Sequence, residues 1–200
     1  MGTVKILPGN QLWLGTDDGS LVNYFIEERP GGNLRLRFRR LISTATGFPR
    51  AMSIWMFVDS KGRLWYAENG APRLHVVDIS AEKPRLVKSL PFDPGARLSN
   101  GREVMEDPDG NFWFAYENNN VLIFNAELKL ERTLENIPGN KEEDVNCIHR
   151  DKDGGVWFGT TNLGLIRLTP DGRTVRIGKA EGLVSTRISH IVEGADRPRW

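Results

Sequence analysis

The ten residues DKDGGVWFGT at 151–160 decide the fold, because the same phrase returns at regular intervals along the chain. Copies occur at 59–67 and 107–115, an abbreviated copy occurs at 9–16, and a last one stops at 196–200. The copies centre on five tryptophans spaced 52, 48, 44 and 43 residues apart, namely Trp13, Trp65, Trp113, Trp157 and Trp200. A repeat of this length, with several short strands in each copy, is typical of β-propeller blades.

Each phrase begins with a tight turn of the form Asp-x-x-Gly. The Asp side chain is expected to accept a hydrogen bond from the backbone two residues on, and the glycine (Gly62, Gly110 or Gly154) to take positive φ. The phrase also resembles the start of a calcium loop, but the further ligands of such a loop are missing, so we interpret it as a turn. The tryptophans recur in every copy, which favours packing between blades over ligand stacking.

The segments between the turns predict an all-β fold with four strands in each repeat. We therefore expect a β-propeller of about four blades plus the start of a fifth, forming a fragment of a larger ring. The expected blades are residues 1–43, 44–95, 96–140 and 141–183, with a partial blade at 184–200. An apolar column nine residues before each tryptophan marks the innermost strand, and it holds Val4, Met56, Val104, Ile148 and Ile191. Exposed blade faces should make such a piece prone to self-association.

Composition argues against several classes of function. The chain of 200 residues has a formal net charge of +1 and no long apolar run, which offers no overall case for nucleic acid or direct membrane contact. Cys147 is the only cysteine, so neither an internal disulfide nor a cysteine zinc cluster can form. The histidines, His75, His149 and His190, fall in different predicted strands. We expect no metal, no cofactor and no catalytic residue, and we expect that this chain is not by itself an enzyme.

Candidate ligand-binding residues lie in the loops that lead from one repeat into the next. Antiparallel order brings these loops together at one end of the blades, and their sequences vary, as binding loops on a rigid scaffold do. The nominated residues are Arg50, Arg97, Asn100, Arg102, Asn146 and Arg187. Arg102 and Asn146 come first because they begin strands expected next to the central channel, and Phe48 or Tyr116 would offer a stacking surface. The alternative is that these residues are solvated and satisfy backbone groups at loop ends.

The phrases GGVWFGTTNLGL at 154–165 and GLVSTRI at 182–188 carry a family resemblance. The sequence resembles the two-component regulator propeller repeat of bacterial sensor proteins. The resemblance is weakest in the first two copies, where Ala67 and Glu68 replace Gly-Thr and the first turn lacks its Asp. It implies a seven-bladed propeller outside the cytoplasm that recognises a small molecule or an oligosaccharide. The remaining blades and a histidine kinase or cyclase would lie outside this chain.

Two other functions stay open. Streptogramin-lyase propellers use a similar glycine–tryptophan phrase, and that reading expects a His and a Glu around a divalent ion in blades outside this chain. A protein-interaction scaffold would instead present a large apolar or charged patch.

Overall fold

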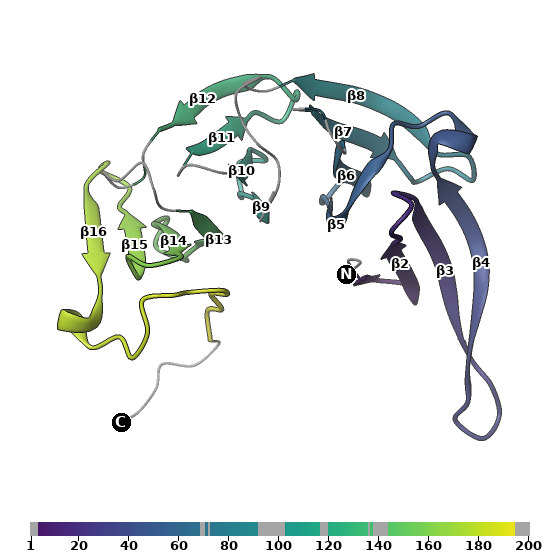
Figure 1. Ribbon diagram of the computed structural model, residues 1–200, viewed down its shortest axis with the longest axis horizontal. Coiled ribbons are helices and arrows are strands. Elements are labelled where there is room, and N and C mark those ends of the chain that lie inside the picture. Colours follow the sequence, from purple (N-terminus) through teal and green to yellow (C-terminus); the bar gives the residue numbers. More distant parts are fainter. Residues whose placement is uncertain are drawn as a thin grey trace. The chain divides into compact units, whose positions relative to one another are not determined.

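The computed structural model describes residues 4–68, 71, 73–91, 103–116, 120–135, 137 and 144–194, without the side chains of 52–55 and 116. These residues form four antiparallel sheets of four strands, and in each sheet the strands are neighbours in chain order (Figure 1). The prediction of an all-β fold built from four-stranded propeller blades is confirmed. The chain divides into two compact units, Met1–Leu98 and Ser99–Trp200, which are described separately below.

The first unit contains two sheets. The first sheet consists of β1 (Val4–Leu7), β2 (Gln11–Gly15), β3 (Leu21–Glu28) and β4 (Leu34–Ile42). After a short 3-10 segment, η1 (Thr44–Thr46), the second sheet consists of β5 (Ala51–Val58), β6 (Arg63–Glu68), β7 (Arg73–Asp78) and β8 (Arg85–Pro91). Alternation along each strand sends one set of side chains to the space between these two sheets. Trp13, Leu21 and Ile42 pack there against Met56 and Leu64.

The second unit repeats this plan. The third sheet consists of β9 (Glu103–Glu106), β10 (Phe112–Tyr116), β11 (Asn120–Phe124) and β12 (Leu130–Leu134). The fourth consists of β13 (Val145–Arg150), β14 (Val156–Thr160), β15 (Leu165–Leu168) and β16 (Thr174–Ile177), followed by the 3-10 segment η2 (Lys179–Glu181). Val121 and Ala115 of the third sheet share a core with Ile148, Phe158 and Ile166 of the fourth. No helix among the described residues is long and apolar enough to cross a membrane.

The predicted apolar column is only partly buried. Met56, Val104 and Ile148 are buried, and Ile191 is half-buried, but Val4 is 59% exposed. The expectation for Val4 was therefore wrong. Val4 lies on the face of the first sheet opposite Trp13, and within the described residues of its unit the second sheet covers only the Trp13 face.

The start of a fifth blade is not seen as a strand. Residues 184–194 carry no strand, and 195–199 together with Trp200 lie outside the described residues. The segment nevertheless lies along the fourth sheet, because the Ile188 N–H donates to the Thr160 carbonyl at 2.9 Å and the Gly164 N–H donates to the Thr186 carbonyl at 2.9 Å. No described strand flanks its other side, so it has no ladder partner that would make it a strand.

Candidate functional site

Three of the four blades carry the same hydrogen-bonded pair of an aspartate and a tryptophan six residues later. Each Asp uses Oδ1 to accept from two backbone N–H groups of its own turn, and the following glycine takes a φ of 72° to 84°. The other carboxylate oxygen of each Asp, Oδ2, accepts from the indole Nε1–H, at 2.8 Å for Asp59–Trp65, 3.0 Å for Asp107–Trp113 and 2.7 Å for Asp151–Trp157. We call this arrangement the Asp–Trp pair. It fixes the turn and the indole together.

A neighbouring side chain completes each pair, and its source differs from blade to blade. In the second sheet Arg63, two residues before the tryptophan, donates to Asp59 at 2.7 Å. In the third sheet Asn111, at the equivalent position, donates to Asp107 at 3.2 Å, and Arg150 of β13 approaches the same oxygen at 3.4 Å. The fourth sheet has a glycine at this position.

That glycine, Gly155, makes room for an arginine from another strand. Arg167 of β15 reaches Asp151 Oδ2 with Nε at 3.0 Å and Nη2 at 2.7 Å, and it lies 5.5 Å from the centre of the Trp157 ring. A Cβ at Gly155 would come within 2.9 Å of both Arg167 and Asp151. The missing side chain therefore allows Arg167 to stack on the indole.

The negative charges of Asp107 and Asp151 are stabilised despite the burial of these side chains. Burial raises the pKa of Asp151, but hydrogen bonds from Trp157, Arg167 and Gly155 outweigh it and leave the pKa below its usual value. For Asp107, burial is likewise outweighed by Trp113, Asn111 and the nearby Arg150, and its pKa is also lowered. Both carboxylates are thus ionised near neutral pH and act as hydrogen-bond acceptors.

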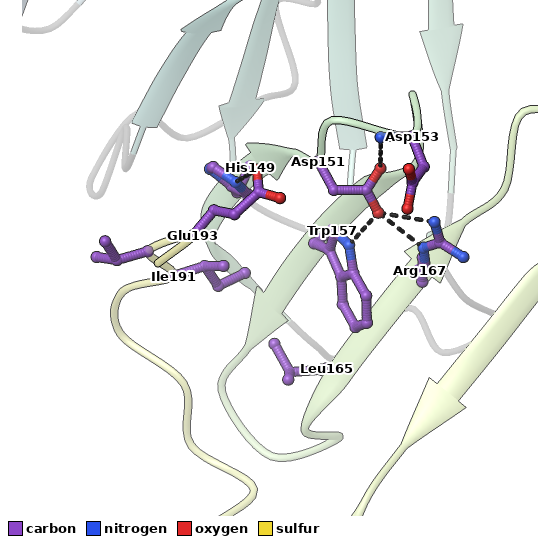
Figure 2. Close-up of a pocket in the computed structure, with 9 residues that line it drawn as sticks. His149, Asp151, Asp153, Trp157, Leu165, Arg167, Ile191 and Glu193 are labelled. Carbon is purple, nitrogen blue, oxygen red and sulfur yellow. Dashed lines mark hydrogen bonds and ion pairs between the residues drawn. The ribbon is translucent and has the colours of Figure 1, made fainter. Parts of the chain in front are cut away.

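A cavity of about 510 Å³ opens beside the Asp–Trp pair of the fourth sheet (Figure 2). This volume lies within the range of small-ligand sites. The wall formed by the sheet and the wall formed by the following segment both contribute side chains. The lining consists of His149, Asp151, Asp153, Trp157, Leu165, Arg167, Ile191, Val192 and Glu193. We call this cavity the blade-4 pocket.

The two walls of the blade-4 pocket bring a histidine of the sheet and a glutamate of the following segment together. His149 Nε2 and Glu193 Oε2 are 3.7 Å apart, and Figure 2 shows both side chains on the side of the pocket away from Arg167. Among the described residues, the buried His149 Nε2 has no hydrogen-bond partner. A ligand hydroxyl or amide between Trp157 and Glu193 would supply that partner.

The composition of the pocket suits a ligand with an apolar ring face and polar edges. Trp157, Leu165 and Ile191 provide apolar surface, while the carboxylates of Asp153 and Glu193 are available as acceptors. Asp151 and Arg167 neutralise each other. No group of three metal-ligating side chains occurs in the part of the chain that the structure describes.

Of the nominated loop residues, the three that the structure describes, Arg50, Asn146 and Arg187, do not line the blade-4 pocket. Asn146 donates from Nδ2 to the Ile188 carbonyl at 3.0 Å, so it holds the segment that carries the exposed Arg187. In the other unit, exposed Arg50 donates from Nε to the Asp18 carbonyl at 3.0 Å. These bonds of Arg50 and Asn146 agree with the loop-end role left open above. Arg97, Asn100 and Arg102 lie outside the described residues.

Of the two residues named as stacking surfaces, the structure describes only the side chain of Phe48. Phe48 packs against the core of the first unit, and the side chain of Tyr116 is not described. His75, in contrast, is fully partnered: its Nδ1 lies 2.9 Å from Ser89 Oγ and its Nε2 lies 2.9 Å from Glu68 Oε2. His75 is buried in the second sheet, where these contacts satisfy it as a core histidine.

Sequence reasoning missed the residues of the blade-4 pocket. His149 was assigned only to a predicted strand, and Arg167 and Glu193 were not singled out. One signal was available: Gly155 stands where two other copies have Arg63 and Asn111, which indicates that another side chain fills that place.

The comparisons with known proteins agree with this architecture. The two-component regulator propeller model matches residues 141–162. This stretch contains four residues of the blade-4 pocket, His149, Asp151, Asp153 and Trp157. No curated protein sequence matches the chain.

Solved β-propellers match the chain at low sequence identity. A catalytically inactive virginiamycin B lyase from Staphylococcus aureus, solved with quinupristin, has a TM-score of 0.57 and 18% identity, with 89% of this chain and 56% of that one covered. The extracellular domain of a hybrid two-component system from B. thetaiotaomicron has a TM-score of 0.57 and 18% identity, with 98% and 30% covered. BamB from Moraxella catarrhalis has a TM-score of 0.59 and 12% identity, with 86% and 51% covered.

These likenesses establish the fold, and the chain spans between about a third and just over half of each of these larger propellers. The resemblance seen in the sequence is confirmed where the family model matches. Residues 141–162 match the two-component regulator propeller repeat, in a chain whose four sheets match β-propeller blades.

Proposed function

We propose that this chain is part of the ligand-recognising propeller of an extracytoplasmic bacterial sensor. The observation that carries the proposal is the two-component regulator propeller repeat at 141–162, whose residues form one wall of the blade-4 pocket. The fold match to the extracellular domain of a hybrid two-component system supports it. The chain contributes recognition of a small molecule or an oligosaccharide, and the kinase or cyclase that reads the signal lies outside it.

The blade-4 pocket is the site that this function would use. Its indole is held rigid by Asp151 and Arg167, which lowers the entropy lost when a ring stacks against it. Hydroxyl groups at the ring edge would donate to Glu193 and Asp153. His149 Nε2 would gain the hydrogen-bond partner that it lacks among the described residues.

A matched pair of tryptophan variants tests the site. Trp157→Phe and Trp113→Phe each remove one Asp–Trp hydrogen bond, but only Trp157 lines the pocket. In calorimetric titrations against a panel of oligosaccharides, Trp157→Phe should weaken the best ligand roughly threefold, since the smaller phenyl ring keeps only part of a stacking contribution on the order of 0.5–1.5 kcal/mol. Trp113→Phe should leave its affinity unchanged. Equal effects of the two variants would remove the blade-4 pocket from the proposal.

The second candidate is a lyase, and it rests on the His149–Glu193 contact together with the fold match to virginiamycin B lyase. A histidine and a carboxylate facing one pocket can serve as an acid–base pair. Incubation with quinupristin, followed by chromatography, tests this alternative. If the unmodified chain consumes quinupristin and the His149→Ala variant does not, the result would favour the lyase over the sensor.

A further inference from the structure

The first sheet carries an arginine-rich hairpin that plays no part in the proposed function. β3 and β4 are 8 and 9 residues long, whereas β1 and β2 have 4 and 5 residues. The far half of the hairpin, where Glu28 pairs with Leu34, therefore extends past its two neighbours in the sheet (Figure 1). Its sequence alternates leucine or phenylalanine with arginine from Leu34 to Arg39.

Alternation sorts these side chains onto opposite faces of the hairpin. Arg35 pairs with Glu27, and Arg37 pairs with Phe25, so both arginines lie on the face that also carries Gln11. Arg39 joins them, because its Nη1 donates to Gln11 Oε1 at 2.8 Å. The other face carries the exposed apolar residues Leu34, Leu36 and Phe38. We call the first face the arginine face.

The guanidinium groups of the arginine face are exposed yet held in place. Arg37 and Arg39 lie 5.4 Å and 4.6 Å from the centre of the Phe25 ring. Arg37 also pairs with Glu27 at 2.7 Å, and Arg35 has no partner among the described residues. With one acidic residue against three arginines, the face has a surplus of positive charge, although the whole chain is nearly neutral. Stacking on one ring reduces the entropy lost on binding.

The arginine face leads into a second cavity. Arg39 and Gln11 line a space of about 450 Å³ together with Asp59, Ser60 and Ile79 of the second sheet. Asp59 does not offset the arginine charge there, because it is already paired with Arg63 at 2.7 Å. The cavity and the strand form a continuous track, with arginines about 6.8 Å apart along the strand.

We propose that this track binds an acidic polysaccharide, a linear sugar chain that carries carboxylate or sulfate groups. Guanidinium groups pair with such oxyanions through two parallel N–H donors. Single-stranded nucleic acid fits less well, because its binding relies on exposed aromatic platforms. On this face Trp13 is fully buried, and Phe25 is covered by Arg37 and Arg39. Tyr24 and Phe38 lie on the opposite face.

The test compares two triple variants that remove the same charge. Arg35→Gln/Arg37→Gln/Arg39→Gln disrupts the track, and Arg85→Gln/Lys129→Gln/Arg173→Gln removes three exposed cations elsewhere. Binding to dextran sulfate, polygalacturonate, neutral dextran and oligodeoxythymidine is measured by biolayer interferometry in about 0.15 M salt, where distant charges are screened. The track variant should bind the acidic polysaccharides roughly tenfold more weakly, from three exposed ion pairs of up to about 1 kcal/mol each. The control variant should bind the acidic polysaccharides as tightly as the unmodified chain does. Neutral dextran should bind to none of the three proteins.

Several outcomes would overturn the proposal. Equal losses in both triple variants would show a general charge effect, and tighter binding of oligodeoxythymidine would assign the track to nucleic acid. Absence of binding by the unmodified chain would leave the arginines as charges that protect the edge strand β4 from pairing. If the track variant fails to fold, Arg35→Gln alone decides, because the Arg35 side chain has no partner among the described residues and its variant should still bind more weakly. The blade-4 pocket variants report on a different unit, so either proposal can fail without the other.

Discussion

The first sheet and the other three differ at one position of the repeat, six residues before the tryptophan. Asp59, Asp107 and Asp151 occupy it in the second, third and fourth sheets, whereas the first has Leu7. The consequence is visible at the indole. Trp13 is fully buried, and among the described residues its Nε1 has no hydrogen-bond partner. The indole is thus held by burial alone in the first blade, by burial and a hydrogen bond in the second, and by a hydrogen bond at a half-buried position in the third and fourth.

The turn changes with the missing carboxylate. In the first sheet both Gly9 and Asn10 take positive φ, at 76° and 56°. In the other three turns the residue equivalent to Gly9 does not take positive φ, and only the glycine after it does. Without the Asp side chain to bind the turn N–H groups, the chain uses Pro8-Gly9, a sequence that adopts a different tight turn. The comparison separates two roles: apolar packing places the indole, and the aspartate selects the turn and fixes the ring.

Removal of the carboxylate from a complete pair should have the largest effect. Asp59→Ala leaves four donors without their acceptor, two backbone N–H groups, Arg63 Nε and Trp65 Nε1. We expect a loss of about 3 kcal/mol in the free energy of unfolding, measured by urea titration of tryptophan fluorescence, because buried donors lose their partners. Asp171→Ala, at an exposed turn, is the control and should change little. A similar result for both variants would mean that burial alone holds the tryptophans.

Replacement of the indole itself should show an intermediate effect. Trp13→Phe and Trp65→Phe remove the same volume from fully buried sites, but only Trp65 loses a hydrogen bond. The Trp65 variant should therefore be less stable than the Trp13 variant by about 1.5 kcal/mol, the low end of the net contribution of a hydrogen bond to a charged group. Thermal unfolding of the two variants side by side measures the difference. The reverse order would contradict the role assigned to the Asp–Trp pair.

The repeat made much of this fold predictable, because its signals are local. Spacing of Trp65, Trp113 and Trp157 gave the blade period, and Asp-x-x-Gly gave the turns. The Asp–Trp bond could have been predicted from the constant six-residue offset between the two residues. The exception in the first sheet could have been predicted because Leu7 stands where the other copies have Asp.

The blade-4 pocket was less accessible to such reasoning. It depends on Arg167 crossing from a different strand into the space left by Gly155, and on Glu193 meeting His149 across a non-local contact. Sequence spacing within one copy does not encode contacts of that kind. The nominated Asn146 has a contact of the same non-local kind, since its side chain donates to the backbone carbonyl of Ile188.

The smallest expected effect comes from rebuilding the missing pair in the first sheet. In the second unit Asp107 meets Arg150, which lies seven residues before the next tryptophan. The equivalent residues of the first unit are Leu7 and Val58, and both pack against the same core and line the same cavity. Leu7→Asp should lose apolar contact with the core. In Val58→Arg alone, the new guanidinium has no carboxylate at position 7 to pair with.

Together, the two changes place a carboxylate within reach of both Trp13 Nε1 and a guanidinium. We expect the double variant to be more stable than the sum of the single effects by about 0.5–1 kcal/mol, the scale of a partly exposed ion pair in a double-mutant cycle. Urea unfolding of the two single variants and the double variant gives this coupling energy, and Leu7→Asn with Val58→Arg removes the charge as a control. Strict additivity would show that the turn at Gly9 and Asn10, rather than the side chain at position 7, keeps the first blade from forming the pair.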